Sequence, residues 1–227
     1  MSDRRIGRIV ATALLGAVIG LSAGCATSAS TTAGHLGPGG SAGGGFNARS
    51  GPAAGGAAGT VGSVSTSSFT ISTSAGQDVT VDEVAATTYQ KGTSSTSASA
   101  ITTGEDVLVL GTTSGTTITA SQVLVQPTGS DGSATSSAAG VLPFQPGAPT
   151  VSKQIGQIPA NYTEGSGTIV SGTAANQATE AALAAYPGGV VDRVVQVSNR
   201  TYEVHNIGVR WPHHIFVGQD FKVVGAD

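Results

Sequence analysis

Two long stretches of small residues divide the chain and limit where a hydrophobic core can form. Residues 25–58 and 127–165 consist largely of Gly, Ala, Ser, Thr and Pro, and the 227-residue chain has 34 glycines. Such stretches bury too little apolar surface to offset the entropy that is lost on ordering. The sequence therefore predicts a flexible tether and a disordered linker in these two places, and two small folded domains, residues 59–126 and 166–227.

The first folded segment, residues 59–126, alternates apolar and polar residues as β-strands do. The segment between the third and fourth strand patterns, residues 93–100, is expected to form a surface loop. The pattern as a whole predicts an all-β domain of five strands. The five runs are 60–64, 68–72, 78–81, 106–111 and 117–125.

The turn residues around these strands carry a further signal. The first run begins Gly59-Thr60-Val61, Thr88-Tyr89 follows the third, and Gly104-Glu105 precedes the fourth. In this order they resemble a small β-barrel module of bacterial surface lipoproteins, with a topology like that of the oligonucleotide-binding (OB) fold. The resemblance implies an OB-like barrel of unknown function. Nucleic-acid binding is not expected, because single-strand binders need a basic groove and Lys91 is the only basic residue in this segment.

The carboxy-terminal segment combines one helix pattern with four strand patterns. Ala174 to Tyr186 is alanine-rich, Ser171-Gly172-Thr173 offers an amino-terminal cap, and Pro187-Gly188-Gly189 ends the pattern. We expect an α+β domain in which this helix covers one face of an antiparallel sheet. The strand patterns occupy 190–197, 201–207, 214–217 and 221–224.

The first hairpin of this domain has a predicted register. A two-residue loop at Asn199-Arg200 places Val195 opposite Val204, and both then lie on the face that the helix covers. The opposite face carries Glu203 and His205 and is expected to be wetter.

A family resemblance accompanies this pattern over residues 167–227. It rests on the runs Ala181-Ala182-Leu183-Ala184-Ala185-Tyr186-Pro187-Gly188-Gly189, Val190-Val191-Asp192-Arg193-Val194, Tyr202-Glu203-Val204 and Asp220-Phe221-Lys222-Val223. Together these runs resemble the PepSY domain, a small α+β module of secreted metalloprotease propeptides and of envelope proteins. The resemblance implies a role in binding or in peptidase inhibition, without catalytic residues.

The amino-terminal residues have the three-part layout of a bacterial secretion signal. Arg4, Arg5 and Arg8 precede an uncharged apolar stretch that is too short for a transmembrane helix, and small residues lead to Cys25, the only cysteine. This layout resembles a lipoprotein signal peptide, residues 1–24, which implies diacylglyceryl modification of Cys25. We therefore expect a lipid-anchored protein on the extracytoplasmic side of the cell membrane.

Charge and side-chain chemistry narrow the function classes. The formal net charge of −3 becomes −5 once the leader, with three Arg and one Asp, is removed, which disfavours nucleic acid as a partner. Hydrolases need a nucleophile, a base and oxyanion donors in one pocket, whereas the four histidines lie in the tether or in the hairpin region, and no acid pair stands at catalytic spacing. We expect no enzymatic activity and no cofactor.

The candidate binding residues stand between the second and third strand patterns of the carboxy-terminal domain. Trp211 is the only tryptophan of the chain and follows Arg210, and Trp and Arg are residue types that often anchor protein interfaces. The predicted function is a non-catalytic binding or peptidase-regulatory module that contacts another envelope protein through this pair. Internal packing of Trp211 against the helix is the alternative for that residue.

Metal binding is the alternative function. His205 with His213 or His214 could hold zinc or copper if the strands align, with Glu203 or Asp220 as an oxygen ligand. His213 and His214 are expected on opposite sides of one strand, so these two cannot share a metal ion. The predicted site therefore contains no assigned metal ligand, and metal binding is kept as a second hypothesis.

Overall fold

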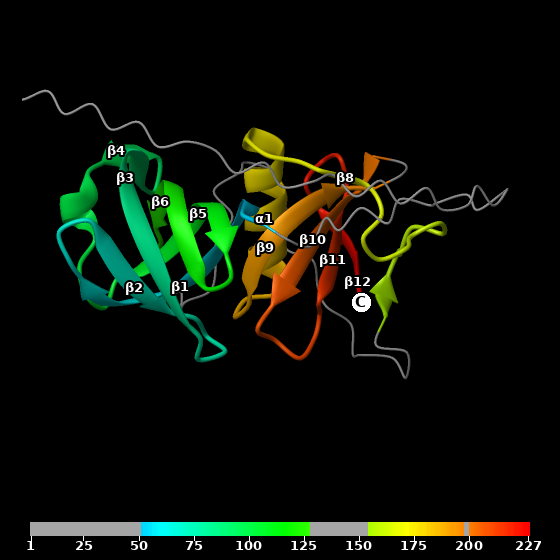
Figure 1. Ribbon diagram of the computed structural model, residues 1–227, viewed down its shortest axis with the longest axis horizontal. Helices are drawn as coiled ribbons and strands as arrows, with labels where there is room; N and C mark the ends of the chain where they lie inside the picture. Colours follow the sequence, from blue (N-terminus) through cyan, green and yellow to red (C-terminus); the bar gives the residue numbers. More distant parts are fainter. Residues whose placement is uncertain (1–50, 128–153, 198–199) are drawn as a thin grey trace, which may run out of the picture. The chain divides into compact units, whose positions relative to one another are not determined.

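Residues 51–127, 154–197 and 200–227 are described by the computed structural model (Figure 1). The predicted leader, Cys25 and most of the tether and linker lie outside these ranges. Within them the chain is mainly β-strand, with one α-helix of 13 residues. No helix in these ranges is long and apolar enough to cross a membrane.

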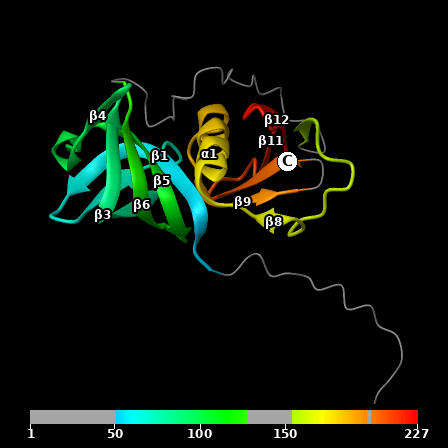
Figure 2. The ribbon, with the colours of Figure 1, turned by 90° about the horizontal axis from the view of Figure 1, so that it is seen from above.

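Residues 53–125 contain a closed five-stranded barrel, as the sequence predicts. Its strands are β1 (Ala53–Val64), β2 (Ser68–Ser72), β3 (Asp78–Lys91), β5 (Asp106–Ser114) and β6 (Thr117–Val125). They pair in the order β1-β2-β3-β6-β5, and β5 pairs with β1 again, so the sheet closes on itself (Figure 2). Phe69, Ile71, Val79 and Val81 point into the barrel and are fully buried, which accounts for the period-two pattern.

The predicted surface loop, residues 93–100, contains two short elements. Strand β4 (Ser94–Thr96) pairs with the end of β3, and a single 3-10 turn (Ala98–Ala100) follows it. Most of its residues are exposed, so the segment lies on the outside of the barrel.

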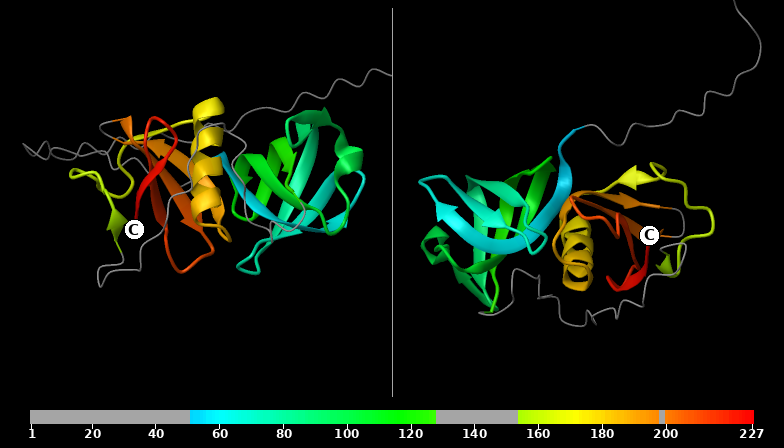
Figure 3. Two further views of the ribbon diagram at one scale, coloured as in Figure 1. Left: turned by 180° about the vertical axis from the view of Figure 1, so that it is seen from behind. Right: turned by 90° about the horizontal axis from the view of Figure 1, so that it is seen from below.

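The carboxy-terminal part is one helix on an antiparallel sheet. Helix α1 (Thr173–Ala185) packs on strands that pair in the order β9-β10-β11-β12-β7, and β8 pairs with β9 (Figure 3). Valines of one sheet face, including Val204, and Ile215 share a core with Ala178, Ala182 and Leu183 of the helix. The strands are β7 (Ile155–Gly156), β8 (Thr168–Ile169), β9 (Val190–Gln196), β10 (Tyr202–Ile207), β11 (His214–Val217) and β12 (Val223–Ala226).

The predicted register of the β9–β10 hairpin is wrong by one residue. Val204 lies opposite Val194, and Glu203 lies opposite Val195. The reason is the connection: the Val197 N–H donates to the Thr201 carbonyl oxygen, so three residues lie between this hydrogen-bonded pair instead of the two of the predicted loop. The Val195 side chain therefore lies on the opposite face of the sheet from the one predicted, and it joins Glu203 on the face away from the helix.

The predicted helix cap is right in position but not in kind, and the predicted wet face is wrong in part. The N-cap position is Gly172, with a φ of 71°, and no side chain caps the helix. The sheet face away from the helix is covered around Glu203 and Val195, each 1% exposed, and around the fully buried Phe216, whereas His205 and His214 on the same face stay partly exposed. Tyr162, from the segment between β7 and β8, packs edge-on against the Phe216 ring at 4.8 Å and covers this face.

Strand β1 corrects the predicted end of the tether. The tether was expected to reach residue 58, but β1 begins at Ala53, and residues 55–59 are all buried. A Cβ on Gly55 would lie 2.0 Å from the Val191 carbonyl oxygen, so only glycine permits this approach of β9. The Gly-Ala run was assigned to the tether because a lack of large side chains suggests disorder. Here the same lack allows neighbouring backbones to pack closely.

The barrel and the helix-bearing sheet are continuous with each other. Gly56 and Ala57 of β1 pair with Val191 and Val190 of β9, which joins all strands into one twelve-stranded sheet. One core cluster contains Leu108, Leu110 and Leu124 of the barrel together with the buried face of α1. The described residues therefore share a core across the two predicted domains.

Candidate functional site

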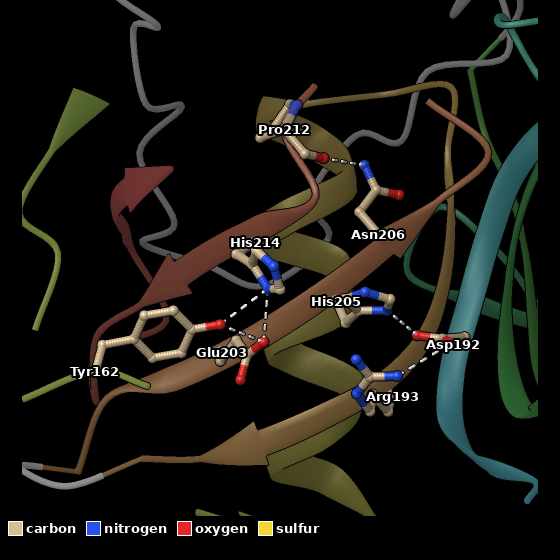
Figure 4. Close-up of polar contacts among 8 residues, drawn as sticks. All are labelled: Tyr162, Asp192, Arg193, Glu203, His205, Asn206, Pro212 and His214. Carbon is tan, nitrogen blue, oxygen red and sulfur yellow. Dashed lines mark hydrogen bonds and ion pairs between the residues drawn. The ribbon is translucent and has the colours of Figure 1, made fainter. Parts of the chain in front are cut away.

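The sheet face opposite α1 carries a group of polar side chains that is unusual in a chain with so few charges (Figure 4). Strand β10 supplies Glu203 and His205, and β11 supplies His214, which lies directly opposite His205. Asp192 and Arg193 come from β9, where Asp192 is the extra residue of a β-bulge. Bulges commonly re-aim side chains, and this one brings Asp192 toward His205.

Glu203 is the buried centre of one half of this group. Its Oε1 accepts a hydrogen bond from the Tyr162 hydroxyl at 3.0 Å and lies 2.7 Å from His214 Nδ1. Its Oε2 is buried and has no hydrogen-bond partner among the described residues. Burial, and then the charge of Glu203, raise the pKa of Tyr162 well above its usual range, so this hydroxyl stays a proton donor.

His205 is the centre of the other half. Its Nδ1 lies 2.6 Å from Asp192 Oδ1, and Arg193 Nη1 donates to Asp192 Oδ2 at 3.3 Å. The carboxylate can only accept, so the His205 proton resides on Nδ1. The His205 and His214 rings are neighbours, with centroids 5.3 Å apart.

An open hollow of about 570 Å³ adjoins the two histidines. Acidic and basic side chains both reach it, so its wall offers hydrogen-bond donors as well as acceptors and is not a surface of a single charge sign. Its lining residues are Glu164, His205, Arg210, Trp211, His213, His214 and Asp227.

The predicted binding residues Trp211 and Arg210 both line this hollow. Arg210 is exposed, whereas Trp211 is partly buried and meets the Tyr186 ring edge-on at 5.5 Å. Trp211 therefore combines packing against the end of α1 with a place in the hollow wall. Buried Asn206 anchors the loop that contains Trp211. Its backbone N–H donates to the His213 carbonyl oxygen, and its Nδ2 donates to the Pro212 carbonyl oxygen.

The structure brings together only part of the ligand set that the metal hypothesis requires. The strands align as it required, with His205 opposite His214, but Glu203 is engaged with His214 and Tyr162. Asp220 lies in the β11–β12 turn, where it pairs with Lys222 at 3.3 Å. Within the described ranges, no group of three or more His, Cys, Asp or Glu side chains is arranged to hold a metal ion.

Sequence reasoning missed Tyr162, Asp192 and Arg193 as members of this site. Tyr162 was assigned to the linker, and nothing in its neighbours indicates a return to the sheet. Asp192 was used only as part of the PepSY resemblance. A carboxylate in the middle of a valine-rich strand was the signal that could have drawn attention to it.

Comparison with known proteins adds no relative. No family model, no curated protein and no solved structure matches this chain. The lipoprotein and PepSY resemblances therefore stay predictions from the sequence.

Proposed function

We propose that this protein is a lipid-anchored envelope protein whose carboxy-terminal sheet binds another envelope protein without catalysing a reaction. The observation that carries the proposal is the hollow beside β10 and β11, which brings Trp211, Arg210 and His213 together. Envelope location and lipid on Cys25 rest on the leader sequence alone. The peptidase class of partner rests on the PepSY resemblance.

Preorganisation supports a binding role for the hollow. The Trp211 ring is held against Tyr186, so its indole loses little freedom when a partner contacts it. Exposed Arg210 beside it supplies charged donors at the rim. A rigid aromatic anchor with a polar rim is the arrangement on which interface hot spots are built.

The test is partner capture from intact cells that express the full chain. Cross-linked partners are compared for the unchanged protein, Trp211→Phe, Trp211→Ala and Arg210→Ala, with Lys222→Ala as a charge-removing control on the β11–β12 turn. We expect one partner to persist with Trp211→Phe and Lys222→Ala and to be lost with Trp211→Ala and reduced with Arg210→Ala. An identical partner list for all five proteins, at equal expression, would contradict the proposal.

A further inference from the structure

The two ring nitrogens of His205 and His214 are used unequally. Each Nδ1 faces a carboxylate, Asp192 at 2.6 Å and Glu203 at 2.7 Å, and the proton therefore resides on Nδ1 in both rings. Each Nε2 then keeps a lone pair, and no described residue hydrogen-bonds to either of these atoms. Two oriented imidazole donors thus stand next to each other with their metal-binding nitrogens unengaged.

A carboxylate on Nδ1 is the outer-shell arrangement that orients metal-binding histidines. It fixes the tautomer and the ring orientation and raises the basicity of Nε2. Here both rings have it, and the carboxylates are themselves held: Asp192 by Arg193 at 3.3 Å and Glu203 by Tyr162 at 3.0 Å. The rings cannot rotate without breaking these contacts.

The spacing of the rings also fits one ion. Two imidazoles that share a tetrahedral metal ion at metal–nitrogen distances of about 2.0–2.1 Å have ring centroids about 5 Å apart. The His205 and His214 centroids are 5.3 Å apart, on directly opposed residues of neighbouring strands (Figure 4). The side chains are 16% and 14% exposed and reach the hollow, so an ion can enter from solvent.

We propose that His205 and His214 bind one divalent transition-metal ion through Nε2, with the remaining positions filled by water or by a group from a partner. Imidazole suits zinc, nickel and copper, and copper(II) should bind most tightly of the three. Only two protein ligands are involved, which agrees with the lack of a three-ligand group in the described ranges. This inference goes beyond the proposed protein-binding role and does not depend on it.

The test is calorimetric titration of the full chain carrying Cys25→Ser with copper(II) and zinc(II) chloride. His35 stays in every variant, so its contribution cancels in the comparison. We expect copper(II) affinity to fall at least tenfold in His205→Ala and in His214→Ala, and to stay within about threefold in His213→Ala. Asp192→Asn should weaken it 10- to 100-fold, the range typical of lost outer-shell partners.

A second measurement needs no variant and is therefore insensitive to folding defects. Electron paramagnetic resonance of the copper(II) complex should show splitting from two imidazole nitrogens. Splitting from one nitrogen or none, or unchanged affinity in the double variant His205→Ala/His214→Ala, would overturn the inference. Trp211→Ala should keep the metal affinity, so loss of partner capture and loss of metal binding are separate results.

Discussion

At the scale of single residues, Glu203 is the least expected feature of the molecule. It is 1% exposed, and one of its carboxylate oxygens is hydrogen-bonded to both Tyr162 and His214. A buried carboxylate is tolerated only when it is hydrogen-bonded, and removal of a partner is costly because the charge stays behind. The sequence could place Glu203 and His205 on one strand face, but not the tyrosine that covers them, because Tyr162 arrives from a stretch rich in small residues.

The Tyr162 hydroxyl gives a testable dependence of stability on pH. Its pKa in the folded protein is raised above the ordinary value of 10.0, so the unfolded chain loses this proton first when the pH rises. The stabilisation is fully present below pH 10 and is lost progressively above it. Tyr162→Phe should cost about 1–2 kcal/mol at pH 7 through the lost hydrogen bond and make the decline above pH 10 shallower.

The measurement is urea unfolding of both proteins between pH 7 and 11. Tyr89 and Tyr186, whose pKa values are raised to about 12 mainly by burial, remain in both proteins and leave a residual decline. Parallel curves for the two proteins across the whole range would show that Tyr162 contributes nothing to the alkaline loss.

At the scale of elements, β1 shows what composition can and cannot predict. The alternating runs of the barrel were recognisable because large apolar side chains fill its inside, as Ile71 and Val81 do. The Gly-Ala run at the start of β1 has no such side chains and was assigned to the tether. Its order comes from backbone contacts with β5 and β9, which are distant in sequence.

Glycine-to-alanine substitutions along β1 test whether the Gly-Ala run is packed in the sheet or belongs to the tether. A Cβ at Gly56 would lie 2.2 Å from the Val109 carbonyl oxygen, whereas the nearest atom to a Cβ at Gly62 would be the Thr70 Oγ1, at 3.3 Å. We expect Gly56→Ala to destabilise the protein by about 1–3 kcal/mol or more through overpacking. Gly62→Ala on the same strand should stay within about 1 kcal/mol of the unchanged protein, since it stiffens the unfolded chain.

Chemical denaturation with a common m-value provides the comparison. Equal stabilities of Gly56→Ala and Gly62→Ala would mean that the start of β1 is not packed as described, and that the tether does extend to residue 58.

The β9–β10 hairpin shows why register is hard to predict. Both Val194 and Val195 are buried, so the apolar pattern of β9 fits either face, and the predicted two-residue loop decided the register wrongly. Arg200 adopts a positive φ of 61°, a conformation that the sequence does not announce for arginine. A covered sheet with two apolar faces removes the alternation on which such predictions depend.

At the scale of the whole molecule, the two predicted domains share one core across β1. Leu108 and Leu110 of the barrel lie in the same cluster as the helix residues Ala178 and Leu183. The β2–β3 turn adds a buried hydrogen bond, from the Thr73 hydroxyl to the Gly188 carbonyl oxygen at 2.7 Å. The sheet that carries the hollow is thus supported by the barrel, and we expect both parts to unfold together.

Calorimetry combined with tryptophan fluorescence measures directly whether the barrel and the carboxy-terminal sheet unfold together. Trp211 is the only tryptophan and reports on the carboxy-terminal sheet, whereas Ile118→Ala removes a fully buried side chain from the barrel, at a cost of about 2–5 kcal/mol. A shared core predicts one calorimetric transition whose midpoint coincides with the fluorescence midpoint, and an equal downward shift of both midpoints in Ile118→Ala. Two transitions, with the Trp211 midpoint unmoved by Ile118→Ala, would contradict it.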